Sequence, residues 1–367
     1  MRMFRWLRPG KSRGEGTDAR TSGREHDPGM RPQGNVKISR RYKVAALLLA
    51  LMALTGCGRN PPDQVAKIVL GAETAPHSSP VWIAENKGYF LERGVNVEIR
   101  EFESGRTALR SMLNAEGIDI VTAAQTPVVF NSFSRNDYAI VGGMVYSEND
   151  VKLLARQDRG ITAAANLKGK TVGMTAGSSG HFFLGLFMAY FQMRASDVNT
   201  VDLEPAVLSK AIIDGQVDAI ATWEPHIYKA RQVLGDKAFL LSSGGIYRTD
   251  FYFVARKEFI RNHFEALKRF LRAIEKAEGF IQNHNKEAMD IVVQRLKMDR
   301  AILNETWESF RFAQFLDQSI LTSLEDEARW AIRNRLTHAS KMPNYLGYVH
   351  IDAMKAVKPE AVQIAGD

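Results

Sequence analysis

Small polar residues stand at the start of three expected helices, each directly after a strand-like segment. They are Ser78 and Ser79, Ser104 and Gly105, and Ser178, Ser179 and Gly180. The backbone N–H groups at a helix N-terminus, together with the positive end of the helix dipole, can hold an anion or another hydrogen-bond acceptor. Serine and glycine also cap helices and form turns, so one such loop alone favours a structural role. Three of them in paired units favour a binding cleft.

Two histidines and a Trp-Glu pair could add to this cleft. His77 and His181 lie in two of the loops, where a histidine attracts an anion when protonated and donates a hydrogen bond when neutral. Trp223 and Glu224 follow a strand-like segment and could supply an apolar wall and a hydrogen-bond acceptor. An ordinary turn with a half-buried tryptophan explains the Trp-Glu pair equally well.

Sequence signatures of catalysis and metal binding do not occur after residue 57. That part of the chain has no HExxH motif, no P-loop, no Gly-x-Gly-x-x-Gly fingerprint and no Gly-x-Ser-x-Gly elbow; Gly10–Gly14 spells the last pattern, but no strand-like segment precedes it. The chain's one cysteine, Cys57, belongs to an expected lipid anchor described below, which leaves no thiol for a disulfide or a nucleophile. We therefore expect no enzymatic activity, no metal site and no cofactor.

The elements that must position these loops alternate between strands and helices. Lys67–Gly71 and Val217–Ala221 are typical of buried strands, and a helical pattern follows each polar loop. This order predicts an α/β fold with a largely parallel sheet. Residues 258–340 look almost wholly helical.

The strand–loop–helix pattern restarts once, which predicts two lobes. Expected crossings between the lobes lie at Lys152–Ala155 and Phe251–Ala255. They divide the chain into a first lobe of residues 65–155 plus 251–367 and a second lobe of residues 156–250.

The N-terminal segment is typical of an exported lipoprotein. Basic residues precede an eleven-residue apolar run, Val44–Leu54, which is too short to span a bilayer of about 30 Å but fits a signal peptide. Leu54–Cys57 resembles a lipobox, so we expect cleavage before Cys57 and lipidation of its thiol. Residues 1–57 are then leader and signal peptide and residues 58–64 a tether. We further expect translation to start at Met30, with residues 1–29 not translated.

The charge distribution separates this leader from the mature chain. The whole protein carries a formal charge of +8. The first 56 residues hold twelve Lys and Arg against four Asp and Glu, which accounts for all of that excess. The remainder is formally neutral, so we expect no nucleic-acid partner.

Five segments resemble one family of transport receptors. They are Trp82–Val97, Glu116–Asp119, Leu167–Gly173, Gly177–Phe183, and Gly215–Ala219 with Trp223–Pro225. In order and spacing they are similar to the substrate-binding lipoproteins of ABC transporters for nitrate, sulfonates, taurine and thiamine-pyrimidine precursors. The resemblance covers residues 65–255 well and the C-terminal third only in character.

The resemblance implies a type II periplasmic-binding fold, in which two α/β lobes close around a solute by bending at a hinge. It places the loops at Ser78, Ser104, Gln125 and Ser178 on the cleft. The implied ligand-binding residues are His77, Ser78, Ser79, Ser104, Gly105, Gln125, Thr126, Ser178, Ser179 and His181, with Trp223 and Glu224 on the far wall.

In these cleft loops Arg106 is the one basic residue besides the histidines. An anionic solute would therefore rest on N–H groups, hydroxyls and Arg106, while an uncharged or zwitterionic solute fits as well. The expected partners are a small solute and a membrane permease, and the expected protein is a monomer anchored outside the cytoplasm. Two alternatives stay open: a ligand-sensing lipoprotein for a signalling protein, and a pyrimidine-precursor enzyme on the same fold.

Overall fold

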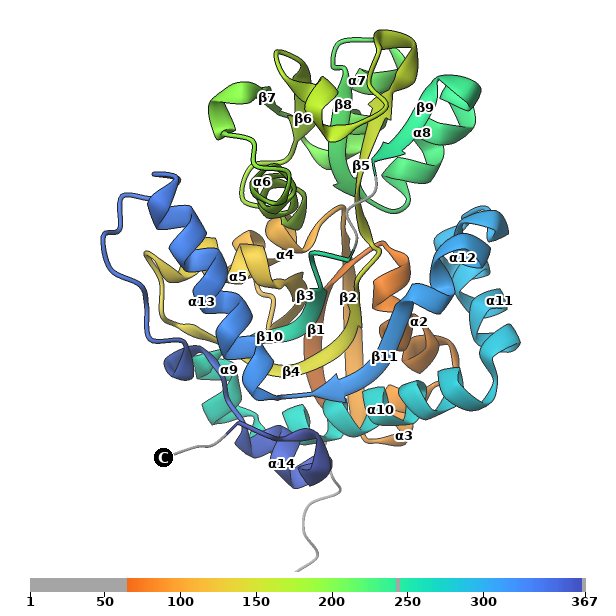
Figure 1. Cartoon of the computed structure of the whole chain (residues 1–367). Coiled ribbons are helices and arrows are strands. Elements are labelled where there is room, and N and C mark those ends of the chain that lie inside the picture. Colours follow the sequence, from red (N-terminus) through yellow and green to blue (C-terminus); the bar gives the residue numbers. More distant parts are fainter. Residues whose placement is uncertain (1–64, 242–244, 365–367) are drawn as a thin grey trace, which may run out of the picture. The chain divides into compact units, whose positions relative to one another are not determined.

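The computed structural model describes residues 65–241 and 245–364. Cys57, the leader and the tether expected at residues 58–64 lie outside the described residues. The described chain forms two β-sheets with helices packed on both, as the alternating sequence pattern predicts (Figure 1). The α/β fold class is therefore confirmed.

The first sheet has six strands in the order β11-β4-β10-β3-β1-β2. Their bounds are β1 (Ala66–Glu73), β2 (Val95–Phe102), β3 (Ile120–Ala124), β4 (Tyr138–Ser147), β10 (Thr249–Arg256) and β11 (Phe310–Phe315). β1 pairs in parallel with β2 and β3, whereas β10 and β11 pair antiparallel with their neighbours. The helices around this sheet are α2 (Ser79–Asn86), α3 (Tyr89–Glu92), α4 (Gly105–Leu113), α5 (Gln125–Ser132), α9 (Lys257–Asn262), α10 (Phe264–Asn283), α11 (Asn285–Leu296), α12 (Arg300–Thr306), α13 (Gln318–Arg333) and α14 (Asp352–Val357).

The second sheet has five strands in the order β7-β6-β8-β5-β9. They are β5 (Val151–Arg156), β6 (Thr171–Met174), β7 (Asn199–Asp202), β8 (Ala219–Trp223) and β9 (Ala238–Leu241). One core joins this sheet to α6 (Ser179–Tyr190), and a separate core joins its other face to α7 (Pro205–Ile213) and α8 (His226–Leu234). The sheet is therefore covered by helices on both faces.

Both sheets are mixed, which corrects the expectation of a largely parallel sheet. The chain enters the second sheet through β5 and returns to the first through β10, and both strands pair antiparallel with the strands beside them. Lys152–Ala155, expected at a crossing, lies inside β5 and pairs with β8. The chain passes between the sheets at residues 148–150 and again between β9 and β10.

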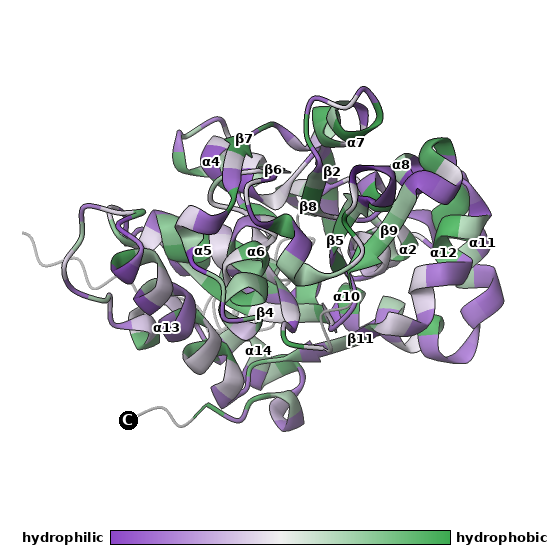
Figure 2. Ribbon diagram, turned by 45° about the horizontal axis from the view of Figure 1, so that its top comes forward, coloured by the Kyte–Doolittle hydropathy of each residue, from purple (hydrophilic) through white to green (hydrophobic). Residues whose placement is uncertain are grey.

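The C-terminal part is mainly helical, with one exception. β11 interrupts the stretch that the sequence pattern assigned to helices and forms the edge of the first sheet. Its alternating burial, with Phe310 and Phe312 buried and Arg311 exposed, is that of a strand with one covered face. α10 buries Leu267, Phe270 and others along one face, as its spacing predicts. Figure 2 shows hydrophobic and hydrophilic stretches alternating along the peripheral helices α11 to α13.

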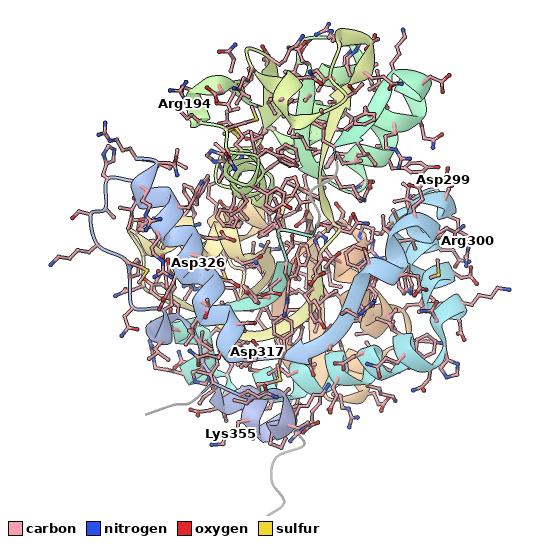
Figure 3. The ribbon with its side chains drawn as sticks, in the orientation of Figure 1. Arg194, Asp299, Arg300, Asp317, Asp326 and Lys355 are labelled. Atoms are coloured by element: carbon pink, nitrogen blue, oxygen red, sulfur yellow. The ribbon has the colours of Figure 1, made fainter. Side chains whose placement is uncertain are left out.

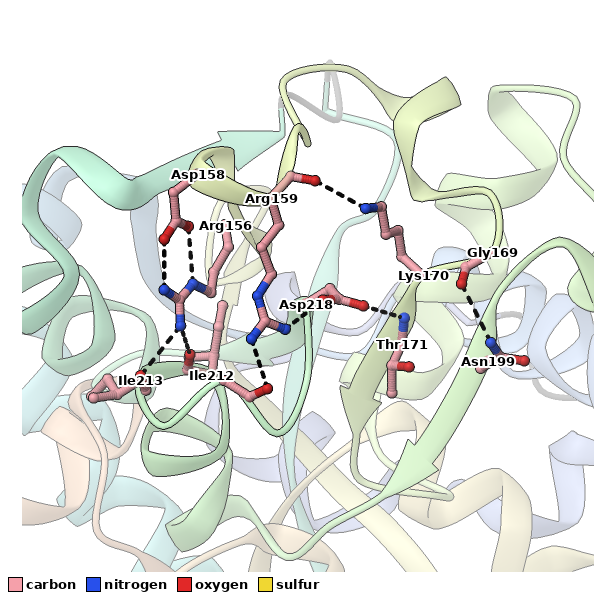
Figure 4. Close-up of polar contacts among 11 residues, drawn as sticks. Arg156, Asp158, Arg159, Gly169, Lys170, Thr171, Asn199, Ile212, Ile213 and Asp218 are labelled. Carbon is pink, nitrogen blue, oxygen red and sulfur yellow. Dashed lines mark hydrogen bonds and ion pairs between the residues drawn. The ribbon is translucent and has the colours of Figure 1, made fainter.

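Two aspartates hold equivalent strands in the two sheets. Asp119 precedes β3, and its carboxylate accepts a hydrogen bond from the Val69 N–H of β1 at 2.9 Å. Asp218 precedes β8, accepts from the Thr171 N–H of β6 at 2.8 Å, and pairs with Arg159 at 2.5 Å (Figure 4). Both carboxylates are therefore used for strand alignment within each sheet.

Candidate functional site

A cavity lies between the two sheets and is lined from both sides. The lining residues are Glu73, His77, Ser104, Gly105, Arg106, Ala124, Pro127, Ser178, Ser179, Trp223 and Phe251. The centre of a water-sized sphere can reach only about 20 Å³ of it, which is room for about one water molecule. We call it the central cavity.

Two helices approach the central cavity with their N-termini because glycine lets them come close to a strand. A Cβ atom at Gly105, the first residue of α4, would lie 2.7 Å from the Ala123 Cα of β3. A Cβ atom at Gly180, in the first turn of α6, would lie 2.5 Å from the Ala221 carbonyl oxygen of β8. Each sheet thus brings one helix N-terminus to the cavity by the same local device.

The serines before these helices are engaged in local hydrogen bonds. Ser104 caps α4, since its hydroxyl accepts a hydrogen bond from the Thr107 N–H at 3.2 Å. The Ser178 hydroxyl donates to the Thr175 carbonyl oxygen at 2.7 Å. Both residues line the cavity, but their hydroxyls also stabilise the turns that hold the helices in place.

Glu73 occupies the N-terminus of α4. It ends β1, and its Oε2 accepts a hydrogen bond from the Gly105 N–H at 2.9 Å. The Nε2 atom of His77 lies 3.2 Å from the same carboxylate oxygen, and the His77 ring stacks on Phe251 with a centroid separation of 3.8 Å. Burial lowers the pKa of His77, but the Glu73 carboxylate, helped by Asp150, outweighs this effect, so the pKa lies above its usual value.

Arg106 joins the two sheets' units across the edge of the cavity. Its guanidinium binds both oxygens of Glu204, at 2.8 and 2.9 Å, and donates to the Ala176 carbonyl oxygen at 3.3 Å. Arg106 belongs to α4, whereas Glu204 precedes α7. This arginine is therefore paired within the protein, although it was the basic residue expected to meet an anionic solute.

Glu224 is held in a buried ion pair behind the cavity wall. The carboxylate is fully buried and lies 2.8 Å from the Lys152 Nζ, whose side chain is 14% exposed. Its second oxygen accepts a hydrogen bond from the Tyr228 N–H, in the first turn of α8, at 2.9 Å. Trp223 lines the cavity, but Glu224 is not among the lining residues.

Asp150 is a buried carboxylate at the first crossing between the sheets. It is 2% exposed, and neither oxygen has a hydrogen-bond partner among the described residues. Burial raises the pKa of Asp150 to about 7, opposed chiefly by the positive charges of His77 and Lys152. No sequence motif marks this residue, because its environment is created by segments distant in the chain.

A wider groove of about 480 Å³ opens beside α6 and α13. Gln125 lines it, and its side chain donates to the Arg248 carbonyl oxygen at 2.8 Å and accepts from the Asp250 N–H at 2.9 Å. Glu327 is buried there, and burial raises its pKa to about 8. Tyr247 donates to the Glu327 carboxylate at 3.4 Å.

The twelve expected binding residues are thus distributed over several environments. The central cavity is lined by His77, Ser104, Gly105, Ser178, Ser179 and Trp223, and the groove by Gln125. Ser78, Ser79, Thr126, His181 and Glu224 line neither of the two. His181 instead contacts Trp330 with a ring separation of 5.0 Å, and Ser78, Ser79 and Thr126 are buried beside the helix starts.

Sequence reasoning missed Glu73, Phe251 and Asp150. One feature of the sequence could have pointed to Glu73: this carboxylate ends a strand directly after the uncharged run Ile68–Ala72. Among the described residues, no group of three or more His, Cys, Asp and Glu side chains is arranged to hold a metal ion.

Comparison with known proteins places the fold and the family. Residues 75–288 match the family model described as NMT1/THI5 like. A Bacillus subtilis (strain 168) protein named for aliphatic sulfonate binding is 26% identical over 302 residues, covering 79% of this chain and 89% of the relative.

Solved structures share the fold. The alkanesulfonate-binding protein SsuA from Xanthomonas axonopodis pv. citri, bound to MOPS, matches with a TM-score of 0.66 and 22% identity, covering 82% of this chain and 99% of that one. The desulfurization enzyme DszB matches with a TM-score of 0.59 and 13% identity, over 80% of this chain and 99% of that one. The chain has the periplasmic binding protein fold and belongs to the NMT1/THI5-like family.

Proposed function

We propose that the protein is an extracytoplasmic receptor that binds a small solute for an ABC importer and does not transform it. The observation that carries this proposal is the central cavity, which is lined by helix N-termini from both sheets. Its volume admits about one water molecule, so an organic solute enters only when the two sheets' units move apart. The names of relatives that bind alkanesulfonates support the same function.

We divide the chain for this motion into two lobes. Lobe 1 consists of residues 65–147 and 249–364, and lobe 2 of residues 151–241. The described crossing at residues 148–150, between β4 and β5, belongs to the hinge. This division follows the strand pairing and moves the expected boundaries by a few residues.

Polar contacts at the rims of the lobes support a reversible closure. Arg231 of α8 lies 2.7 Å from Glu305 of α12, and the Tyr228 hydroxyl lies 3.3 Å from the Asp299 carboxylate. Asp299 stands at the start of α12 (Figure 3). Arg106 and Glu204 form a similar bridge at another edge. Solvent-exposed pairs of this kind contribute about 0–1 kcal/mol each, so they bias closure without locking it.

The proposed receptor is exported, anchored by lipid at Cys57, monomeric, and delivers its solute to a membrane permease. No helix among residues 65–241 and 245–364 has the length and apolar character needed to cross a bilayer. The anchor rests on the sequence of residues 40–57 alone, and globomycin-sensitive processing of the full chain would test it. The Cys57→Ser variant is expected to keep its signal peptide. If the wild-type protein keeps its signal peptide as well, the proposed anchor is contradicted.

The receptor function is tested by thermal melting with a panel of nitrate, bicarbonate, taurine, alkanesulfonates, aromatic sulfonates and aminopyrimidines. A true solute at one hundred times its dissociation constant adds about 2.7 kcal/mol of stability. Mass spectrometry of the recovered solute decides between binding and catalysis. Recovery of an altered compound would refute the receptor proposal.

A further inference from the structure

The groove beside α6 and α13 is separate from the central cavity. No residue lines both of them. The volume of the groove, about 480 Å³, is that of a typical small-molecule site. α6 belongs to lobe 2 and α13 to lobe 1, so a molecule in the groove would contact both lobes.

The walls of the groove are apolar and largely aromatic. Phe182 and Leu186 line it from successive turns of α6, and Trp330 lines it from α13. The Phe182 ring stands edge-on to the Trp330 ring, with a centroid separation of 5.1 Å, and to the Tyr247 ring at 5.4 Å. Aromatic side chains add edge-to-face and offset-stacked contacts to the burial of apolar area when a further ring joins them. These walls therefore suit a flat aromatic body.

One buried polar atom of the groove has no hydrogen bond. Glu327 lines the groove and is 1% exposed. Its Oε1 lies 3.4 Å from the Tyr247 hydroxyl, but its Oε2 has no hydrogen-bond partner among the described residues. Gln125, in contrast, uses both its side-chain nitrogen and its side-chain oxygen. Because buried polar atoms are usually satisfied, Oε2 of Glu327 indicates a missing polar group.

The Glu327 carboxyl group is a neutral acid at pH 7. Burial raises its pKa to about 8. The hydroxyls of Thr126 and Tyr247 oppose this shift. The nearby carboxylates of Asp250 and Asp326 add to it. A protonated Oε2 is a hydrogen-bond donor, so the group that it lacks is an acceptor.

The basic side chains of the groove do not neutralise Glu327. Arg248 lies 2.7 Å from Asp250, and Arg329 lies 2.8 Å from Asp326. Arg333 stands in the last turn of α13 with its side chain exposed. Within the described chain Glu327 therefore forms no ion pair that would hold it ionised.

We propose that the groove binds a flat aromatic molecule whose neutral hydrogen-bond acceptor, a carbonyl oxygen or a ring nitrogen, meets the Glu327 carboxyl group. Bound there, the molecule contacts α6 and α13 at once and stabilises the present arrangement of the two lobes. This site goes beyond the proposed receptor function, because it lies outside the central cavity. Its failure would leave the role of the central cavity untouched.

Matched small probes test the proposal by ligand-observed NMR titration of the full protein at pH 7. Acetophenone carries a ring and an acceptor, ethylbenzene lacks the acceptor, and cyclohexyl methyl ketone lacks the aromatic ring. One hydrogen bond or one aromatic contact is worth about a factor of five in affinity, so acetophenone should bind about fivefold more tightly than either. Equal or tighter binding of either control, or no binding of acetophenone at millimolar concentration, would overturn the proposal. Tighter binding of benzylammonium would show that Glu327 is ionised in the complex and would overturn the neutral acceptor.

Variants of Glu327 locate the contact. Glu327→Gln keeps a hydrogen-bond donor and should bind acetophenone like wild type. Glu327→Met has a similar length but no donor, so it should bind acetophenone about fivefold more weakly and ethylbenzene unchanged. Glu360→Met makes the same chemical change at an exposed position of lobe 1 and should bind both probes like wild type. An unchanged affinity of Glu327→Met for acetophenone would overturn the role of Glu327.

The pH dependence supplies a readout that a merely structural role would not move, and it needs only variants that keep the donor. Acetophenone does not titrate, so its affinity for wild type should fall about threefold or more between pH 7 and pH 9, as Glu327 loses its proton near pH 8. Glu327→Gln should show no such fall. A constant wild-type affinity, or a fall that Glu327→Gln shares, would overturn the proposal.

Discussion

Replacing Lys152 by methionine tests whether Glu224 is a structural residue or a solute ligand. The Lys152 Nζ lies 2.8 Å from the Glu224 carboxylate, and Glu224 is fully buried. Methionine keeps much of the length of lysine but carries no charge. In Lys152→Met, Glu224 keeps its hydrogen bond from the Tyr228 N–H and loses its only ion-pair partner among the described residues.

The expected loss of stability is large because a buried charge is left uncompensated. Removing one member of a buried ion pair costs about 3–5 kcal/mol. For a chain of this size, each kcal/mol lowers the melting temperature by about 2 °C. Lys152→Met should therefore melt about 6–10 °C below wild type.

Differential scanning calorimetry of four variants separates the explanations. Lys355→Met changes an exposed lysine on α14 and serves as the control (Figure 3). Its melting temperature should equal that of wild type. The double variant Lys152→Met/Glu224→Gln should recover part of the loss, since its glutamine has no charge to bury. A melting temperature of Lys152→Met within 1 °C of wild type would refute the buried-pair reasoning. A Glu224→Gln variant that melts like wild type but no longer binds solute would restore the ligand role expected from the sequence.

Two further changes test closure and the buried acid of the groove. A Cβ atom at Gly185 would clash with the Trp330 Nε1, so Gly185→Ala should hold α6 away from α13. We expect this change to weaken solute binding at least tenfold, as measured by titration. An unchanged affinity would show that Trp330 moves aside. Glu327 has a folded-state pKa of about 8 against an ordinary 4.5, so the folded protein binds the extra proton and loses stability as pH rises from 4.5 to 8. The loss is about 4 kcal/mol by pH 7.5 at 1.36 kcal/mol per unit. Urea unfolding should show a shallower pH dependence for Glu327→Gln, and equal slopes would contradict this assignment.

Residue types and their spacing were enough to predict the local parts of the site. The small polar loops begin α4 and α6, Ser104 caps its helix, and glycine stands where each helix approaches a strand. These features depend on backbone geometry within a few residues, which residue type and spacing encode directly. For the same reason the α/β class and the apolar face of α10 were predictable.

The pairing of the charged side chains, in contrast, depends on how the whole chain folds. β11 looked helical because its pairing partner, β4, lies more than 160 residues earlier in the chain. Glu224 and Arg106 looked like ligands, yet they pair with Lys152 and Glu204, which are 72 and 98 positions away. A side chain's charge is written in the sequence, but its partner is set by which strands and helices the fold brings together. The same folding leaves Asp150 buried without a hydrogen-bond partner among the described residues.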